Sequence, residues 1–430
     1  MSNSPSLLPS STLSRPLILL SAIVCGIAVA NVYFPQALSP LIADDLHVTS
    51  SSAALVVTCA QLGYASGIFL VVPLGDRLPH RGLVTTLLLL TCAGLVLAAT
   101  APSLPVLAIA CALVGLATVV PQILIPMAAG LAAPERRGAV TGTLLSGLIG
   151  GILLARTFSG TLGQWLGWRA PFLVAAALAL VLAVVMAAAL PRTVPSTRQP
   201  YVKLLASCVH LLHAEPLLRR SCQYQALVFA AFSAAWTALA LFVTGPRYHL
   251  GTQAVGVIAL VGAASMFATP VAGRRTDRHG PDAVSPVCMT AAIAAGLLLL
   301  TGNLGGVAGL VGLGAGLLLL DVAVQSGQVA NQARIFALRP EARARLNTAY
   351  MTCAFLGGSV GSWAGVRAYT AFGWTGVCTL VALLSGLALL RHTLRDRPTT
   401  PATKRLVLAE DQPPSKSAGT DGLPPTRLHR

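Results

Sequence analysis

Apolar runs long enough to cross a membrane recur along the whole 430-residue chain. A helix needs about 20 mostly apolar residues to span the hydrocarbon layer of a bilayer. Twelve runs meet this length, with approximate limits 16–42, 52–74, 82–102, 104–132, 138–164, 168–190, 222–246, 252–273, 283–302, 305–333, 346–371 and 373–391. Pro and Gly interrupt several of them, which membrane helices tolerate when neighbouring helices satisfy the freed backbone groups. The sequence therefore predicts an all-α polytopic membrane protein with twelve transmembrane helices.

The composition excludes soluble and disordered proteins. Hydrophobic residues make up 55% of the chain and charged residues only 10%, whereas soluble domains carry about 25% charged residues. The net charge of +16 would suit nucleic acid only if the basic residues clustered on one soluble face, but they punctuate the apolar runs. We therefore expect the lipid bilayer as surroundings and no nucleic-acid partner.

The basic residues predict the orientation, because basic loops stay on the cytoplasmic side. With the N-terminus inside, 25 of the 29 Lys and Arg residues fall in inner segments. Arg169, Arg247 and Arg367 lie at outer ends, and Arg156 lies inside a run. Residues 28–30 (Ala-Val-Ala) imitate a signal-peptidase site, but cleavage there would break this charge pattern. We expect a multi-pass protein of a bacterial-type inner (plasma) membrane, with both termini cytoplasmic and the first helix retained.

An internal repeat divides the chain into two halves. Three pairs share an offset of 206 residues, and a fourth has an offset of 201: Pro134-Glu135 with Pro340-Glu341, Gly167-Trp168 with Gly373-Trp374, Gln122 with Gln328, and Asp76-Arg77 with Asp277-Arg278. Two similar halves around a midplane site are typical of secondary transporters. The predicted domains are a cytoplasmic segment (1–15), a six-helix bundle (16–190), a cytoplasmic central loop (191–221), a second six-helix bundle (222–391) and a disordered cytoplasmic tail (392–430).

These features resemble the major facilitator superfamily, whose loops after the second and eighth helices carry Gly-x-x-x-Asp-Arg/Lys-x-Gly followed by basic residues. The second copy keeps all four motif residues, Gly273, Asp277, Arg278 and Gly280. Pro281 and Asp282 replace its trailing basic pair. The first copy keeps Asp76, Arg77 and Arg81 but has Val72 and Pro79 where glycines are expected. The resemblance implies two pseudo-symmetric six-helix bundles.

The motif carboxylates lie at the C-terminal ends of inward-running helices. A negative charge there is unfavourable by about 0.3–1 kcal/mol unless it is compensated. Nearby arginines or the N-terminus of another helix can compensate it. The resemblance implies that Asp76 and Asp277 face the starts of the eleventh and fifth helices and latch the inner side shut. The alternative is a solvated turn that only fixes orientation.

One acidic residue lies near the middle of the bilayer. A polar stripe on one face of the expected helix begins at Asp321 and continues through Gln325, Gln328 and Gln332. Charged residues inside a bilayer are functional candidates, and burial favours the neutral form of a carboxyl group. Asp321 could therefore exchange a proton, bind a cationic substrate, line the cavity without a direct role, or be a structural hydrogen bonder.

Arg156 is the second charge inside a run. It could snorkel to the outer headgroups, pair with Asp321 or with an anionic substrate, or pack structurally. In the resembling family the first, fourth, seventh and tenth helices line the cavity, and many antiporters carry an acid in the first; here that helix offers only polar residues such as Asn31, Tyr33 and Gln36. We predict a substrate and proton site formed by seven residues: Asp321, Gln325, Gln328, Arg156, Gln122, Asn31 and Tyr33.

Other features allow weaker interpretations. Gln61, Tyr64, Gln225, Trp236, Asn347 and Tyr350 could line the cavity or simply join helices. Small residues recur every fourth position over 147–163 and at Gly357, Gly361 and Gly365, which lets helices approach closely; the seams could slide during transport or only pack. In the central loop, Cys208, His210, His213 and Glu215 could hold a metal or belong to an interfacial amphipathic helix, which we favour.

We predict a secondary transporter that alternates access by rocking its two halves, and no enzyme. The chain lacks a Gly-x-x-x-x-Gly-Lys phosphate loop, which disfavours ATP-driven transport, and we expect no cofactor and no metal site. The resemblance to the twelve-span drug/metabolite:proton antiporters implies proton-coupled export of small organic compounds or drugs by a monomer. The alternative is proton-coupled uptake of a small organic nutrient.

Overall fold

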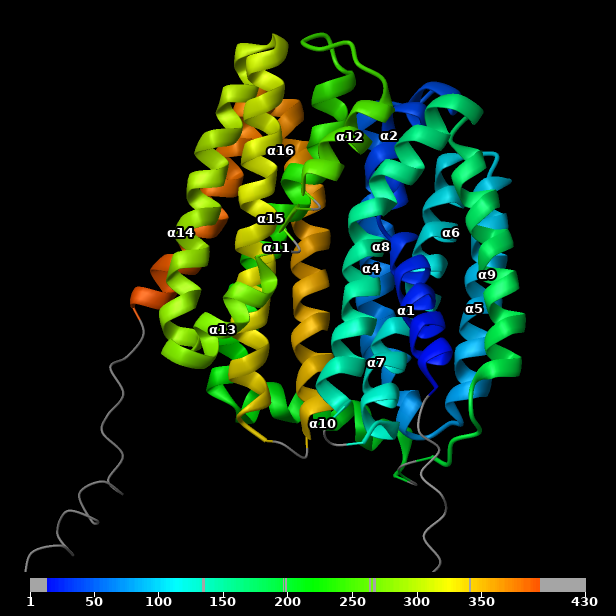
Figure 1. Ribbon diagram of the computed structural model, residues 1–430. Helices are drawn as coiled ribbons and strands as arrows, with labels where there is room; N and C mark the ends of the chain where they lie inside the picture. Colours follow the sequence, from blue (N-terminus) through cyan, green and yellow to red (C-terminus); the bar gives the residue numbers. More distant parts are fainter. Residues whose placement is uncertain are drawn as a thin grey trace, which may run out of the picture. The chain divides into compact units, whose positions relative to one another are not determined.

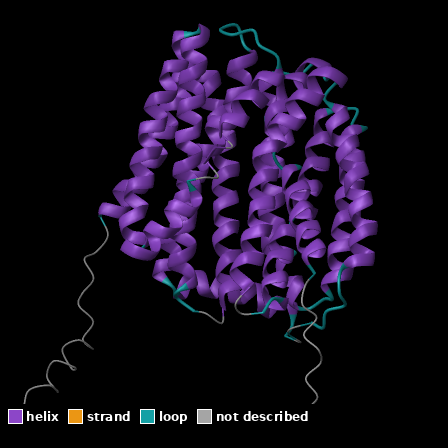
Figure 2. Ribbon diagram, in the orientation of Figure 1, coloured by secondary structure: helices purple, strands orange, loops and turns teal. Residues whose placement is uncertain are grey.

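A computed structural model describes residues 14–394, apart from 134–135, 196, 198, 263, 266–267 and 340–341. Every regular element in this part of the chain is a helix, and most of the helices run side by side (Figures 1 and 2). The all-α membrane fold is therefore confirmed.

The first half contains two membrane-spanning segments that are broken in the middle. Its helices are α1 (Arg15–Ala30), α2 (Phe34–Asp45), α3 (Ser50–Ala53), α4 (Leu55–Leu70), η1 (Val72–Asp76), α5 (His80–Ala99), α6 (Leu104–Ala117), α7 (Val120–Leu131), α8 (Arg137–Leu166) and α9 (Arg169–Ala189). A proline ring clashes with the carbonyl group four residues earlier. Pro35 accounts in this way for the break after α1, and Pro121 for the break after α6. The Thr118 hydroxyl donates a 2.5 Å hydrogen bond to the carbonyl oxygen of Ala28, so the two breaks support each other.

The second half explains why the twelve expected helices are counted differently. Its helices are α11 (Pro216–Thr244), α12 (Thr252–Gly262), α13 (Thr269–His279), α14 (Pro281–Leu299), η4 (Leu300–Leu304), α15 (Gly306–Phe336) and α16 (Arg343–Thr393). Ten helices of the described chain are long and apolar enough to span a membrane. The eighth expected run is divided between α12 and α13, and α16 covers the last two runs across a kink at Gly373, where φ is +63°. These two differences account for ten helices in place of twelve.

The seams of small residues join helices within one half. A Cβ atom on Gly147 or Gly151 of α8 would overlap the backbone of α1, and one on Gly357 or Gly361 of α16 would overlap the backbone of α11. Backbones that approach this closely depend on the absence of side chains. The position of both seams favours the packing interpretation over sliding between halves.

The central segment contains a further helix, α10 (Tyr201–Ala214), which lies across the end of the bundle opposite α12 (Figure 1). Leu204, Cys208 and Leu211 form its buried face, and burial raises the pKa of the Cys208 thiol. His210 and His213 are exposed on the other side. This arrangement is the amphipathic helix that we favoured. Among the described residues no three His, Cys, Asp or Glu side chains gather as a metal site would require.

Hydrogen bonds hold the central segment against the first half. The Thr193 hydroxyl accepts from the backbone N–H of His80 at 3.0 Å, and the backbone N–H of Thr197 donates to the carbonyl oxygen of Asp76. The segment therefore covers the loop between the second and third spans.

Contacts group the described residues up to Leu390 into one compact unit. Helix α11 begins at Pro216, six residues before the expected start of the second bundle. The repeated Pro134-Glu135 and Pro340-Glu341, most of the expected N-terminal segment, and the expected tail from residue 395 onward lie outside the described residues. The proposed domain boundaries therefore stay predictions.

Candidate substrate and proton site

A cavity of about 840 Å³ lies between the two halves, on the side of α10. The first half contributes residues of α4, η1, α7 and α8, and the second contributes residues of α15 and α16. Four residues with amide side chains that the sequence analysis singled out line it: Gln122, Gln328, Gln332 and Asn347. Its size is within the range of pockets that bind small organic molecules, about 300–1,000 Å³.

Three aromatic residues lie next to this cavity, at its end toward the middle of the bundle. We call them the aromatic plug: Tyr64, Phe229 and Phe355. The ring centroids of Tyr64 and Phe355 are 4.5 Å apart, and those of Phe229 and Phe355 are 5.0 Å apart. Phe355 follows the cavity residue Met351 by one turn of α16, and Tyr64 precedes Ile68 by one turn of α4. The contact between Tyr64 of α4 and Phe355 of α16 joins the two halves.

Asp321 lies beyond the plug and is only 2% exposed. It is seven residues, about 10 Å along the helix, from Gln328 on the same face of α15. The indole Nε1–H of Trp236 donates to Asp321 Oδ1 at 3.0 Å. Asp321 Oδ2 has no hydrogen-bond partner among the described residues and lies against the backbone of Gly262. One carboxylate oxygen is thus fixed and the other is unpartnered.

Arg156 of α8 reaches the same place from the other half. Its Nε–H donates to Gln36 Oε1 at 2.7 Å, and Nη2 has no partner in the described chain. The guanidinium carbon lies 4.0 Å from the ring centroid of Trp236, 5.0 Å from that of Tyr33 and 5.5 Å from that of Phe232. The snorkelling interpretation is wrong, because Arg156 is 1% exposed and points among these rings.

No direct ion pair joins Arg156 to Asp321 among the ion pairs of the described residues. The two charges instead contact one indole: Asp321 contacts the edge of Trp236, and Arg156 contacts its face. The sequence offered Trp236 only as one of several residues that could line a cavity or pack. Phe232 was not among the candidates, because it is an apolar residue within an apolar run.

Contacts between α8 and α12 close the side away from the cavity, and we call them the outer seal. The Thr157 hydroxyl donates to the carbonyl oxygen of Gly256 at 2.8 Å, and the Thr252 hydroxyl donates to that of Gly160 at 3.1 Å. The backbone N–H of Thr252 donates to Gln164 Oε1 at 2.9 Å. On α8, Thr157 directly follows Arg156, and Gly160 and Gln164 follow it by about one and two turns. The charged site therefore lies between the closed outer seal and the open cavity.

The predicted site residues thus fall into two groups. Arg156, Tyr33 and Asp321 come together, while Gln122 and Gln328 line the cavity. Gln325 is half-buried on α15 between the two groups. Asn31 lies at the break between α1 and α2, and neither atom of its side-chain amide has a hydrogen-bond partner among the described residues.

The two copies of the predicted gating motif differ in the structure. Asp76 lines the cavity, as does the start of α16 from Arg343 to Asn347. Arg77 is exposed and Arg81 half-buried. In the second copy Asp277 and Arg278 are exposed on α13, no side chain surrounds Gly273, and Gly280 has a φ of +80°, a conformation that glycine adopts without strain.

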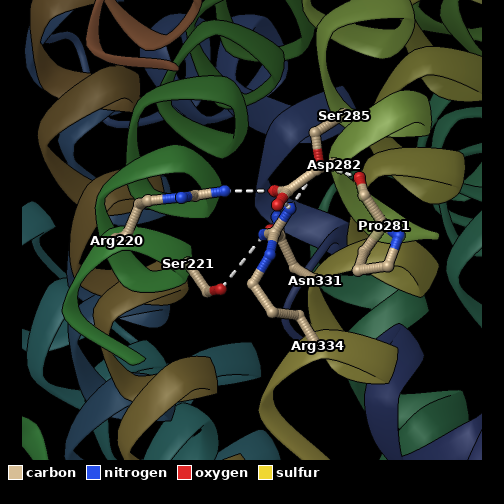
Figure 3. Close-up of polar contacts among 7 residues, drawn as sticks. All are labelled: Arg220, Ser221, Pro281, Asp282, Ser285, Asn331 and Arg334. Carbon is tan, nitrogen blue, oxygen red and sulfur yellow. Dashed lines mark hydrogen bonds and ion pairs between the residues drawn. The ribbon is translucent and has the colours of Figure 1, made fainter. Parts of the chain in front are cut away.

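Asp282, two residues after the last glycine of the second motif, forms ion pairs with two arginines (Figure 3). It contacts Arg220 of α11 and lies 2.9 Å from Nη2 of the buried Arg334 of α15. Arg334 also donates to Ser285, to Asn331 and to Ser221, at 2.9, 2.6 and 3.2 Å. Asp282 lies in the first turn of α14, where a negative charge is favourable. We had noted Asp282 only as a departure from the motif.

The comparisons with known proteins agree with this fold. The family model of the Major Facilitator Superfamily matches residues 18–361. The chain is 37% identical over 382 residues to the transporter YgaY of Escherichia coli (strain K12), covering 89% of this chain and 96% of that protein. It is 30% identical over 270 residues to the chloramphenicol resistance protein of Streptomyces lividans, covering 61% of this chain and 67% of that protein.

Among solved structures, the D323A mutant of the nucleoside transporter NupG aligns with a TM-score of 0.67 at 13% identity, covering 87% of this chain and 98% of that chain. At that identity the likeness concerns the fold alone. The twelve apolar runs, the two halves around a central cavity and the family match agree: the chain is a membrane transporter of the Major Facilitator Superfamily, and not an enzyme.

Proposed function

We propose that the protein exports small organic compounds in exchange for protons, and that Asp321 is the proton site. The observation that carries this proposal is the position of Asp321 between the inner cavity and the outer seal, with one carboxylate oxygen unpartnered. A buried carboxylate must be paired with a cation or be neutral, because an isolated charge in a low-dielectric interior is very unfavourable. Asp321 meets this requirement by exchanging partners as the two sides open in turn.

The direction of transport is supported by a relative. The similarity to a chloramphenicol resistance protein favours outward movement of an organic compound. The cavity on the α10 side has a mixed lining that suits such a compound, with amides such as Gln122 and Gln328 among apolar residues such as Ile123 and Met127.

Alternating access follows from the contacts between the halves. In this state the outer seal is formed and the inner cavity is open, so rocking must break the contacts of Thr252 with α8 and close the cavity walls onto each other. Asp76 and the start of α16 lie on the walls of that cavity. Their approach on closure would form the inner latch, in which the helix N-terminus compensates the carboxylate.

The basic residues support a location in the bacterial inner membrane with both termini cytoplasmic. The cavity side carries α10 and the inner basic residues such as Arg192, Arg343 and Arg345. We therefore take the cavity to open to the cytoplasm.

The test uses inside-out membrane vesicles in which a pH gradient is imposed, with chloramphenicol and a panel of organic compounds as substrates. We expect the wild type to accumulate at least one compound when the lumen is acidic, and Asp321→Asn to lose this accumulation while still moving the compound down its own gradient. Asp44→Asn is the matched control, because that acid is exposed near the end of α2 and lies outside the predicted gating motif. Proton-driven accumulation by Asp321→Asn with an unchanged pH dependence would refute the proton site, and accumulation only in the opposite direction would refute export.

A further inference from the structure

We propose that the substrate is an organic cation and that Arg156 occupies the place of its charged group in this state. The inference rests on the transport function proposed above, and it adds the chemical class of the substrate. The site consists of three rings and one carboxylate, and we call the rings of Tyr33, Phe232 and Trp236 the aromatic cage.

The cage surrounds a single positive charge. All three ring centroids lie 4.0 to 5.5 Å from the guanidinium carbon of Arg156, within the roughly 6 Å over which a cation is attracted to an aromatic face. Phe232 and Trp236 stand one turn apart on α11, with planes at 57° to each other, so they form a corner. Proteins recognise quaternary ammonium groups with such sets of rings.

Asp321 completes the site for a cation. Its hydrogen bond to the indole N–H holds the carboxylate at the positive edge of Trp236, while the negative face of the ring is turned to the charge of Arg156. The unpartnered Oδ2 can accept a hydrogen bond from a substrate that carries an N–H group. The rings and the carboxylate thus favour the same sign of charge.

The contacts of Arg156 allow it to leave the cage, so that a substrate cation can take its place. One hydrogen bond, to Gln36, holds its guanidinium, and Nη2 has no partner in the described chain. Arg156 belongs to the first half, whereas Phe232, Trp236 and Asp321 belong to the second. Tyr33 also belongs to the first half, so rocking that opens the outer seal withdraws Arg156 and Tyr33 together from the two rings of α11 and leaves Asp321 without a nearby cation.

This exchange explains how substrate and proton can be coupled. A buried carboxylate that loses its compensating charge is destabilised, because its charge then stays in the interior without a partner. Either a proton on Asp321 or a cation in the cage restores neutrality. An anionic substrate would instead bind the N–H groups of Nη1 and Nη2 of Arg156, which is why the binding test below includes an anion.

Equilibrium binding to the purified full-length protein in detergent tests the proposal without any gradient. The probe is radiolabelled phenyltrimethylammonium, and the competitors are its uncharged carbon isostere tert-butylbenzene and the anion benzoate. We expect Arg156→Gln to strengthen binding of the cation about tenfold or more, because it empties the cage and removes the competing charge. Trp236→Leu and Asp321→Asn should each weaken binding by about tenfold or more.

Two further variants keep the test decisive. Arg169→Gln is the matched control, because Arg169 also lies over a tryptophan ring, Trp168, at 4.2 Å but outside the site; its binding should be unchanged. Phe232→Leu removes one wall of the cage without removing a charge, and it should weaken binding of the cation. This variant keeps the proposal testable if Arg156→Gln does not fold. Retention of a folded state is checked by size-exclusion chromatography.

The outcomes separate this proposal from the transport function. If Arg156→Gln weakens binding of the cation, or if benzoate binds best and requires Arg156, then Arg156 is itself a ligand for an anion and the proposal is wrong. If no cation binds while proton-driven export persists, the substrate class is wrong and the transport function stands. If the cation binds as expected but Asp321→Asn still couples to protons, the proton assignment is the part that fails.

Discussion

Trp236 contacts both charges of the site with different parts of one side chain. Its indole N–H donates a hydrogen bond to Asp321, and the face of its ring contacts the guanidinium of Arg156. Trp236→Phe keeps an aromatic face but removes the donor, so Asp321 Oδ1 loses its hydrogen bond. A hydrogen bond to a charged group contributes about 1.5–3 kcal/mol, and we expect transport in the vesicle assay to fall about tenfold or more. Trp363→Phe is the control, because Trp363 is about half exposed and lies outside the site. Equal losses in both variants would contradict the role of Trp236.

Single glycines decide how closely the helices of one half can pack. In α16, a Cβ on Gly361 would overlap the backbone of Ala230, whereas a Cβ on Gly386 would meet nothing within 4 Å. Overpacking of this kind costs about 1–3 kcal/mol, while a Gly-to-Ala change in open space favours the helix by up to about 1 kcal/mol. We therefore expect Gly361→Ala to lower the melting temperature in detergent and Gly386→Ala to leave it unchanged or raise it. The same melting temperature for both would show that the seam tolerates a methyl group.

At the scale of elements, the ion pairs of Asp282 join α11, α14 and α15 at their cavity-side ends (Figure 3). Arg334 is buried and donates to four side chains, whereas Arg339, which pairs with Glu215, is about half exposed. Arg334→Gln should reduce stability by about 2 kcal/mol or more, because it leaves buried acceptors unpaired. Arg339→Gln should reduce it by about 0–1 kcal/mol, as is usual for surface ion pairs. Thermal unfolding in detergent measures both, and similar losses would mean that the network is not structural.

At the scale of the whole molecule, the outer seal joins the two halves on the side opposite the cavity. Gln164 accepts from both the backbone N–H and the hydroxyl of Thr252. Gln164→Ala removes these bonds, each worth about 0.5–1.5 kcal/mol, and should raise the ratio of outward-open to inward-open molecules about tenfold, since 1.4 kcal/mol corresponds to a factor of ten.

Spin labels at the exposed positions Leu166 and Leu304 measure this shift. We expect the fraction of molecules with a longer distance between the two labels to rise. The labels require a background in which the nine free cysteines are replaced. Thr143→Ala is the control, because its hydroxyl bonds only within α8. An unchanged distance distribution in Gln164→Ala would show that the seal does not depend on these hydrogen bonds.

The fold class could be predicted from the sequence because it depends on local quantities. Hydropathy over about 20 residues defines a span, and Pro35 and Pro121 act on the carbonyl four residues before them. The stripe through Asp321, Gln325 and Gln328 was readable for the same reason, since one helix fixes which of its own residues share a face. These features need no knowledge of the neighbouring helix.

The partners across the halves were decided only by the tertiary structure. Arg156 and Asp321 are 165 positions apart in the chain, and nothing in the sequence says that Trp236 lies between an acid on its edge and a guanidinium on its face. The ion pair of Asp282 with Arg334 likewise joins two helices, α14 and α15, that pack together. The sequence by itself predicted the apolar runs and, for the helix of Asp321, which residues share a polar face. Which polar faces meet was set by packing, because a hydrogen bond or a cation–π contact depends on distances between helices that no local pattern records.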